Sequence, residues 1–232
     1  MTHPTYRQNA IFAGIFFIIA TALLFVAEPF YRPALTGPDV LTAAAAAKSR
    51  VAAGILIDFT CALAIPLIAI SLYPVLRRVS ASLAVGYVGF RVLEAAILAQ
   101  LQADRMFVLT LSDLYAARPG ADPETLALLV MALVGGEAWS GASGPIYNLA
   151  FVIGMLMLNW ALWTSRLVPR WISGWGLVTA VVLGVLALLV PFVEIPVVLA
   201  VVLITPLAVQ EMVLALWFIA KGFDMTAVAQ LA

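Results

Sequence analysis

Six long apolar segments divide the 232-residue chain, and they constrain its fold more than any other feature of the sequence. A transmembrane helix needs about 17 to 25 mainly apolar residues, and each segment reaches that length. The sequence therefore predicts an all-α, polytopic transmembrane helix bundle with about six spanning helices, forming a single transmembrane domain over residues 1–232. The predicted spans are Ile11–Ala27, Val51–Leu76, Ala81–Leu111, Pro145–Trp163, Trp171–Val190 and Ile195–Ala220.

The scarcity of charge supports this interpretation. Only 10% of the residues are charged and 65% are hydrophobic, with a mean hydropathy of +1.11. A soluble domain carries about 25% charged residues, because its surface must be wetted. The charges here are too few to cover a water-facing surface, so we expect the lipid bilayer to be the main partner of the chain.

Two boundaries follow from residues that usually end helices. Glu28-Pro29 is expected to end the first span, which we interpret as an uncleaved helix because bulky Phe25 does not suit a signal-peptide cleavage site. A shorter apolar piece, Thr125–Val134, precedes Gly135-Gly136 and is too short to span. It is predicted to form a short surface or re-entrant helix.

Basic residues in the short connections predict the orientation. One side of the predicted bundle holds mainly cations, namely Arg7, Arg77, Arg78, Arg166, Arg170 and Lys221. The other side holds four cations together with the acids Glu28, Asp39, Asp113, Asp122, Glu124, Glu137 and Glu194. Because positive residues stay in the cytoplasm, both termini are predicted to be cytoplasmic, in a multi-pass protein of the inner membrane.

Several functions are disfavoured by what the chain contains. The formal net charge is zero, so no basic field favours nucleic acid. The single histidine, His3, lies outside every apolar segment, and the single cysteine, Cys61, is interpreted as a packing residue. No lysine lies mid-span to form a Schiff base, and no GxSxG or HExxH motif occurs. We therefore predict no metal, no cofactor and no catalytic residue.

A narrow polar stripe runs along the Ala81–Leu111 segment. At about 100° per residue its members fall within a sector of about 80°, with Leu98 as the only apolar one. The stripe consists of Tyr87, Arg91, Glu94, Leu98, Gln102 and Arg105. Such a stripe cannot face lipid, so this helix is expected to be central in the bundle.

Four charged residues lie well within the predicted spans, and their charges do not balance. Arg91 is permanently charged and needs a carboxylate, which Glu94 on the same helix and Glu211 on the last span can supply. Asp58 lies nearer the outer side. One cation against three acids leaves an excess. Either two acids carry protons, or a bound cation or polar ligand completes the set.

These residues leave three interpretations of function open. The first is a membrane protein that binds or moves a small molecule, a lipid or protons at a polar site of Asp58, Tyr87, Arg91, Glu94, Gln102 and Glu211. The second is an intramembrane enzyme that uses Glu94 or Asp58 as a general base. The third is a structural or regulatory membrane component without a ligand, since buried ion pairs can fix helix register. The sequence does not predict the oligomeric state.

Small residues recur every fourth position in the fifth span, at Gly176, Ala180 and Gly184. Such spacing lets two helix backbones approach closely. We expect this face to contact another helix of the same bundle.

The chain resembles a bacterial integral-membrane family known only as a domain of unknown function. The resemblance rests on four segments spread over most of the chain, Gly89–Glu94, Pro169–Gly176, Gln210–Met212 and Trp217–Phe223. It implies a bacterial multi-pass membrane protein and implies no activity, substrate or cofactor.

Overall fold

The computed structural model describes residues 4–37, 39–118, 122–141 and 144–231, and His3 lies outside these ranges. The regular secondary structure of the described residues is all helical, and six helices are long and apolar enough to cross a membrane, as predicted. The helices are α1 (Pro4–Leu35), α2 (Val40–Ala46), α3 (Lys48–Val79), α4 (Ala81–Ala117), α5 (Pro123–Ser140), α6 (Pro145–Ser165), α7 (Arg170–Leu189), α8 (Val197–Ala220) and α9 (Met225–Gln230).

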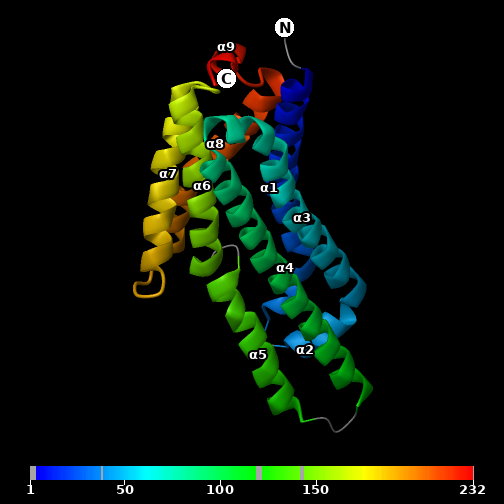
Figure 1. Cartoon of the computed structure of the whole chain (residues 1–232). Helices are drawn as coiled ribbons and strands as arrows, with labels where there is room; N and C mark the ends of the chain where they lie inside the picture. The colour runs from blue at the N-terminus through cyan, green and yellow to red at the C-terminus, as the bar shows by residue number, and fades with distance from the viewer. Residues whose placement is uncertain (1–3, 38, 119–121, 142–143, 232) are drawn as a thin grey trace.

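The long helices form a ring in the half of the bundle that holds both ends of the chain. Going round the ring, α1 contacts α3, α3 contacts α4, α4 contacts α6, α6 contacts α7, α7 contacts α8, and α8 returns to α1 (Figure 1). We expected the Ala81–Leu111 helix to be surrounded by the others. Instead this helix, α4, is one of the six members of the ring and no described helix fills its centre. Its polar stripe nevertheless faces protein, because a ring offers an enclosed interior to one side of every helix.

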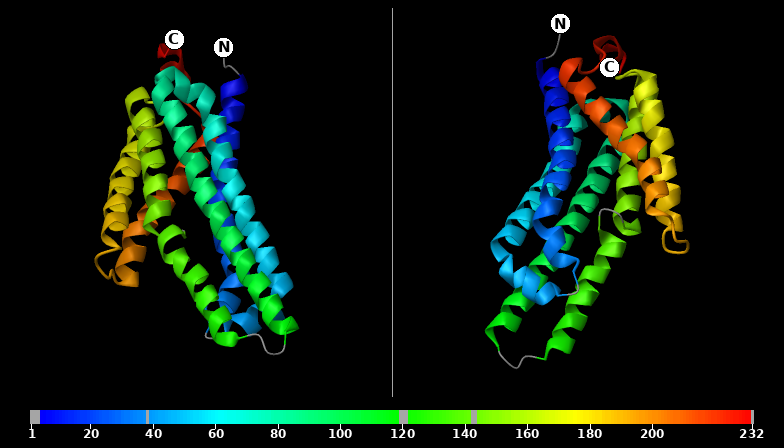
Figure 2. Two further views of the ribbon diagram at one scale, coloured as in Figure 1. Left: turned by 60° about the horizontal axis from the view of Figure 1, so that its bottom comes forward. Right: turned by 180° about the vertical axis from the view of Figure 1, so that it is seen from behind.

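The other half of the bundle is formed by a different set of helices. Figure 2 shows that α7 and α8 stop short, whereas α1, α3 and α4 continue to the far end, where α2 and α5 join them. The apolar side chains accordingly form two cores. One core includes Phe17, Ile65 and Leu72 in the ring, and the other includes Ile55 and Val108 at the far end.

The predicted end of the first helix is wrong, and tertiary packing explains the difference. α1 continues through Glu28-Pro29 to Leu35, since its last turns pack against α3. A Cβ on Gly54 of α3 would lie 2.6 Å from Cβ of Phe30, so the two helices are in close contact there. Membrane helices tolerate internal prolines when neighbouring groups satisfy the freed backbone.

The helix before the fourth span exists as predicted, but it is longer than the sequence suggested. α5 begins after Asp122, whose carboxylate accepts a hydrogen bond from the backbone N–H of Glu124 at 3.1 Å. The side-chain hydrogen bond from Thr125 holds the pKa of Asp122 below its usual value. The helix then passes through Gly135-Gly136 and ends at Ser140. The two glycines therefore do not end it, and this extension carries Glu137.

The small-residue face of α7 contacts α6, as the spacing predicted. A Cβ on Gly176 would lie 2.3 Å from Oδ1 of Asn159, and one on Gly184 would lie 3.2 Å from a methyl group of Val152. Ala180, between them, is fully buried. The α6–α7 pair is thus set by backbone approach, which fixes one side of the ring around the buried charges.

Candidate functional site

A first layer of buried charge surrounds Arg91 in the interior of the ring. The guanidinium group donates to Oε2 of Glu94 at 2.9 Å and to the hydroxyl of Tyr87 at 3.2 Å. Glu211 comes from α8 on the other side, with an oxygen 3.7 Å from Nη2 of Arg91. The hydroxyl of Tyr147 on α6 donates to the second oxygen of Glu94 at 2.9 Å. Three helices, α4, α6 and α8, are therefore joined through Arg91 and Glu94. We call this group of residues the Arg91 layer.

Aromatic rings enclose the Arg91 layer. The guanidinium carbon lies 5.7 Å from the ring centroid of Phe17, 5.4 Å from that of Tyr87 and 5.2 Å from that of Phe151. A cation at that distance over an aromatic ring is attracted by its electron-rich face. Arg91 is 2% exposed and Glu94 is 1% exposed, so the pair is held away from solvent.

A second layer surrounds Arg105, farther along the same stripe of α4. Its guanidinium group donates to Oδ2 of Asp58 on α3 at 2.6 Å and to Oε1 of Glu137 on α5 at 2.8 Å. The same Asp58 oxygen accepts from Gln102 at 3.1 Å and from the hydroxyl of Tyr31 at 3.3 Å. The ring of Tyr31 stacks on Arg105 at 3.9 Å. We call this group the Arg105 layer.

The two layers lie at different depths. Arg91 and Arg105 are 14 positions apart, which corresponds to about 21 Å along an α-helix. The Arg105 layer lies between the two apolar cores, since Ile55 and Val108 belong to one core whereas Ala62 and Leu101 belong to the other. It also meets the end of α5, where the Glu137 side chain is 30% exposed.

Each layer sets one buried arginine against two carboxylates. In the Arg91 layer the acids are Glu94 and Glu211, and in the Arg105 layer they are Asp58 and Glu137. Oδ1 of Asp58 is buried and has no hydrogen-bond partner among the described residues. If all four acids were ionised, each layer would hold one uncompensated negative charge in a region of low dielectric constant, which is costly.

The predicted site residues are all present in these layers, but they do not form one cluster. Tyr87, Arg91, Glu94 and Glu211 lie together, whereas Asp58 and Gln102 belong with Arg105. The sequence interpretation did not include several partners of the two arginines, namely Phe17, Tyr31, Glu137, Tyr147 and Phe151. Glu137 was placed among the acids outside the spans, and nothing local in the sequence marks the aromatic partners.

Neighbouring polar residues support the layers. Gln210, which precedes Glu211, donates to the side chain of Asn159 at 3.3 Å and to the carbonyl oxygen of Ile172 at 3.1 Å. These bonds attach α8 to α6 and α7 and so orient the adjacent carboxylate. Cys61 is buried and its thiol donates to the carbonyl oxygen of Ala20 at 2.9 Å, which agrees with a packing role.

The fold and the buried ion pairs define the class of protein to which the chain belongs. It is a multi-pass membrane helix bundle with arginine–carboxylate layers in its interior. The family model described as "Domain of unknown function (DUF4386)" matches residues 12–222, and the chain belongs to that family. The resemblance noted in the sequence is thereby confirmed. No curated protein and no solved structure matches the chain significantly.

Proposed function

We propose that this protein binds and releases a proton inside the membrane, at Glu211 and Glu94 of the Arg91 layer. The observation that carries the proposal is that a single buried arginine faces two carboxylates from different helices. A buried carboxylate without its own counter-charge takes up a proton instead of remaining ionised. Acids that exchange protons within the membrane are the groups that proton-binding and proton-transfer proteins use.

The geometry favours Glu211 as the carrier of the proton. Glu94 accepts hydrogen bonds from both Arg91 and Tyr147, which stabilise its ionised form. Glu211 lies farther from the arginine, at 3.7 Å, and its side chain is 12% exposed against 1% for Glu94. Glu211 is therefore both the less compensated acid and the one from which a proton can leave more easily.

Enclosure favours a proton over a larger ligand. Tyr87, Arg91 and Glu94 are almost entirely covered by other side chains, and their polar atoms are bonded to one another. A small molecule would need room and free polar groups beside them, whereas a proton needs neither. A fixed, non-exchanging proton would instead give the layer a purely structural role, so exchange is the property to measure.

The test is the infrared absorption of protonated carboxyl groups in the purified protein, recorded between about pH 3 and pH 9, a range that brackets ordinary carboxylates and extends above them. In the wild type we expect a protonated-carboxyl band that persists above about pH 5, where exposed carboxylates are ionised, and is lost at higher pH. In Glu211→Gln this titrating band should weaken by the contribution of one carboxyl group, because Arg91 and Glu94 then form a balanced pair. Glu194→Gln is the control, since Glu194 lies exposed between α7 and α8 and its loss should leave the band intact.

Two results would contradict the proposal. A band that does not change across the pH range would mean that no proton is exchanged. A titrating band of undiminished strength in Glu211→Gln would place the proton elsewhere, and the same measurement on Asp58→Asn would then examine the Arg105 layer.

We also propose that the protein lies in a bacterial inner membrane with both termini in the cytoplasm. The observation that supports this orientation is the set of basic residues at the end of the bundle that holds the termini, including Arg77, Arg78 and Arg166. Reporter fusions after Arg78 and Arg166 should report a cytoplasmic location, and a fusion after Asp122 an external one. An external signal at Arg78 would reverse the orientation.

A further inference from the structure

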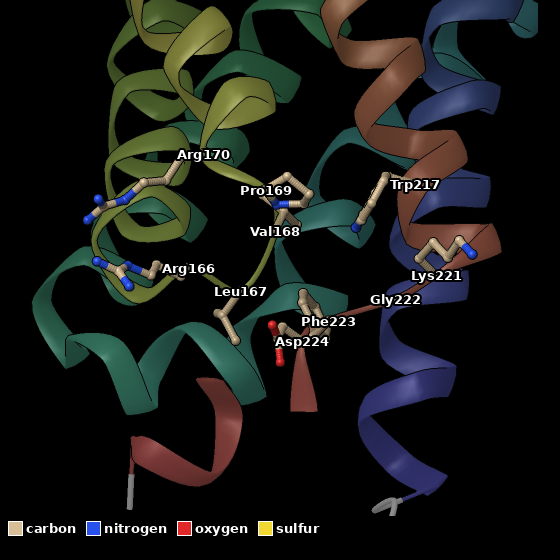
Figure 3. A pocket seen from close by; sticks show the side chains of 10 residues that line it. All are labelled: Arg166, Leu167, Val168, Pro169, Arg170, Trp217, Lys221, Gly222, Phe223 and Asp224. Carbon is tan, nitrogen blue, oxygen red and sulfur yellow. The ribbon is translucent and has the colours of Figure 1, made fainter. Parts of the chain in front are cut away.

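A cavity of about 670 Å³ opens at the end of the bundle where the chain termini lie (Figure 3). It lies between the α6–α7 connection and the segment that follows α8. Each connection contains a residue with a positive φ angle, Arg166 at 58° and Gly222 at 74°. The left-handed turn at Arg166 ends α6 abruptly, so that Arg166 and Arg170 both border the cavity.

The cavity is rich in unpaired positive charge. Arg166, Arg170 and Lys221 line it, and none of them forms an ion pair with a carboxylate among the described residues. Figure 3 shows the two guanidinium groups extending to one side and Lys221 on the opposite side. Because the two guanidinium groups lie together on one side, an anion is attracted to the rim of the cavity beside them.

One acid, Asp224, also lines the cavity. Its carboxylate is already bonded to the start of the adjacent helix α9. Oδ1 of Asp224 accepts hydrogen bonds from the backbone N–H groups of Thr226 at 2.8 Å and of Ala227 at 3.3 Å, which caps α9. The side-chain bond from Thr226 is the largest cause of a pKa of Asp224 below its usual value. Asp224 therefore stays ionised and cancels one of the three positive charges, which leaves the cavity with an excess of cations.

The arginine at the start of α7 is held in place without being neutralised. Nε of Arg170 donates to the carbonyl oxygen of Trp163 at 3.4 Å, and its guanidinium carbon lies 5.3 Å from the ring centroid of Trp163. Both contacts orient the side chain, and its terminal nitrogens donate to no other group among the described residues. An oriented guanidinium fork suits a phosphate group, which accepts two parallel hydrogen bonds from it.

Tryptophans at the same level place the cavity at the depth of lipid headgroups. Tryptophan side chains collect at membrane–water interfaces because one part of the ring is apolar and the N–H group is polar. Trp217 lines the cavity itself, and Trp171, one residue after Arg170, is 57% exposed. Phe223 and Val168 also line the cavity and make part of its wall apolar. An apolar wall suits the glycerol and acyl part of a lipid and contributes nothing to binding a free ion.

We propose that this cavity binds the phosphate-bearing headgroup of an anionic membrane phospholipid. Basic pockets between membrane helices at the interface are suited to such headgroups, and ligand sites are typically about 300 to 1,000 Å³ in volume. The combination of cations, tryptophan and apolar wall distinguishes a lipid from inorganic phosphate. This site is separate from the Arg91 layer and does not depend on proton binding there.

The experiment measures lipid retention by native mass spectrometry of the purified protein titrated with phosphatidylglycerol or with phosphatidylcholine. We expect the wild type to retain phosphatidylglycerol in preference to phosphatidylcholine. In the double variant Arg166→Gln/Arg170→Gln, phosphatidylglycerol binding should weaken roughly 30-fold, from about 1 kcal/mol for each lost cation. A third titration uses inorganic phosphate as the competitor.

Arg50→Gln/Arg118→Gln is the matched control, because it removes the same charge from exposed positions at the opposite end of the bundle. It should leave phosphatidylglycerol binding within about threefold, since charges beyond a Debye length are screened. Equal losses in the two double variants, or equal binding of the two lipids by the wild type, would overturn the proposal. Displacement of the lipid by inorganic phosphate at matched concentration would overturn the lipid assignment in favour of a free-anion site.

Discussion

Replacing Glu94 and Glu211 together by glutamine should destabilise the protein far more than the two single replacements combined. Arg91 cannot lose its charge, and in the double variant it would face only neutral groups, namely the hydroxyl of Tyr87, the sulfur of Met155 and the two introduced amides. A buried charge deprived of its partner typically costs about 3 to 5 kcal/mol. Each single variant retains one carboxylate and should therefore cost less.

The two single variants should also differ from each other. Glu94 lies 2.9 Å from Arg91 and also accepts from Tyr147, so Glu94→Gln should cost more than Glu211→Gln, whose carboxylate lies at 3.7 Å. The measurement is the free energy of unfolding in detergent for the wild type, both single variants and the double variant. Contacting residues show coupling energies of about 0.5 to 3 kcal/mol, and we expect a value at the upper end.

Simple additivity of the two single variants would show that Arg91 does not depend on the pair. The stability of Glu211→Gln also indicates whether the second carboxylate serves function or structure. If Glu211→Gln is more stable than the wild type, the second carboxylate is kept at a cost in stability, as expected for a group that exchanges a proton. If it is less stable, the carboxylate contributes to holding α8 in place.

The sequence predicted the spans and the polar stripe well because both are local properties. Apolar length alone identified six helices that could cross a membrane. The helical period placed Tyr87, Arg91 and Gln102 on one face, and all three are buried. No knowledge of neighbouring helices is needed for either inference.

The partners of the stripe could not be predicted because they depend on how helices are arranged. The sequence groups Asp58 with Arg91 in one polar site, but the packing of α3 against α4 brings Asp58 to Arg105. Glu137 was assigned to the surface because Gly135-Gly136 suggested a helix end. The observed α5 continues past the glycines, and the ion pair of Glu137 with Arg105 supplies a reason for that continuation.

The expectation of a central helix failed for a related reason. A polar stripe shows only that one face of a helix avoids lipid. A helix surrounded by others and a helix in a ring both satisfy that condition, and the choice depends on contacts such as that between α1 and α8, far apart in the chain. The bonds of Arg7 to the carbonyl oxygens of Phe218 and Ile219 help to close that contact.

The second large effect is expected at the Arg105 layer. Arg105→Met removes the only cation bonded to Asp58 among the described residues, and it leaves that buried acid with Gln102 and Tyr31 as its donors. Two carboxylates, Asp58 and Glu137, would then remain in the layer without the cation that both of them bond. We expect a loss of about 3 to 5 kcal/mol in the free energy of unfolding. Asp104→Asn is the control, because Asp104 bonds exposed Gln100 on the same helix and such a pair contributes about 0.2 to 0.5 kcal/mol.

A rescue experiment separates lost charge balance from lost packing in Arg105→Met. The side chain of Arg105 also stacks on the ring of Tyr31 at 3.9 Å, and methionine replaces part of that contact. If the uncompensated carboxylate is the main cost, then adding Asp58→Asn to Arg105→Met should recover stability, although Asp58→Asn removes hydrogen-bonding capacity of its own. If the double variant is instead less stable than Arg105→Met, the arginine acts mainly through packing between the two apolar cores. The Arg105 layer would then be a structural joint, and the Arg91 layer would remain the sole candidate for proton exchange among the described residues.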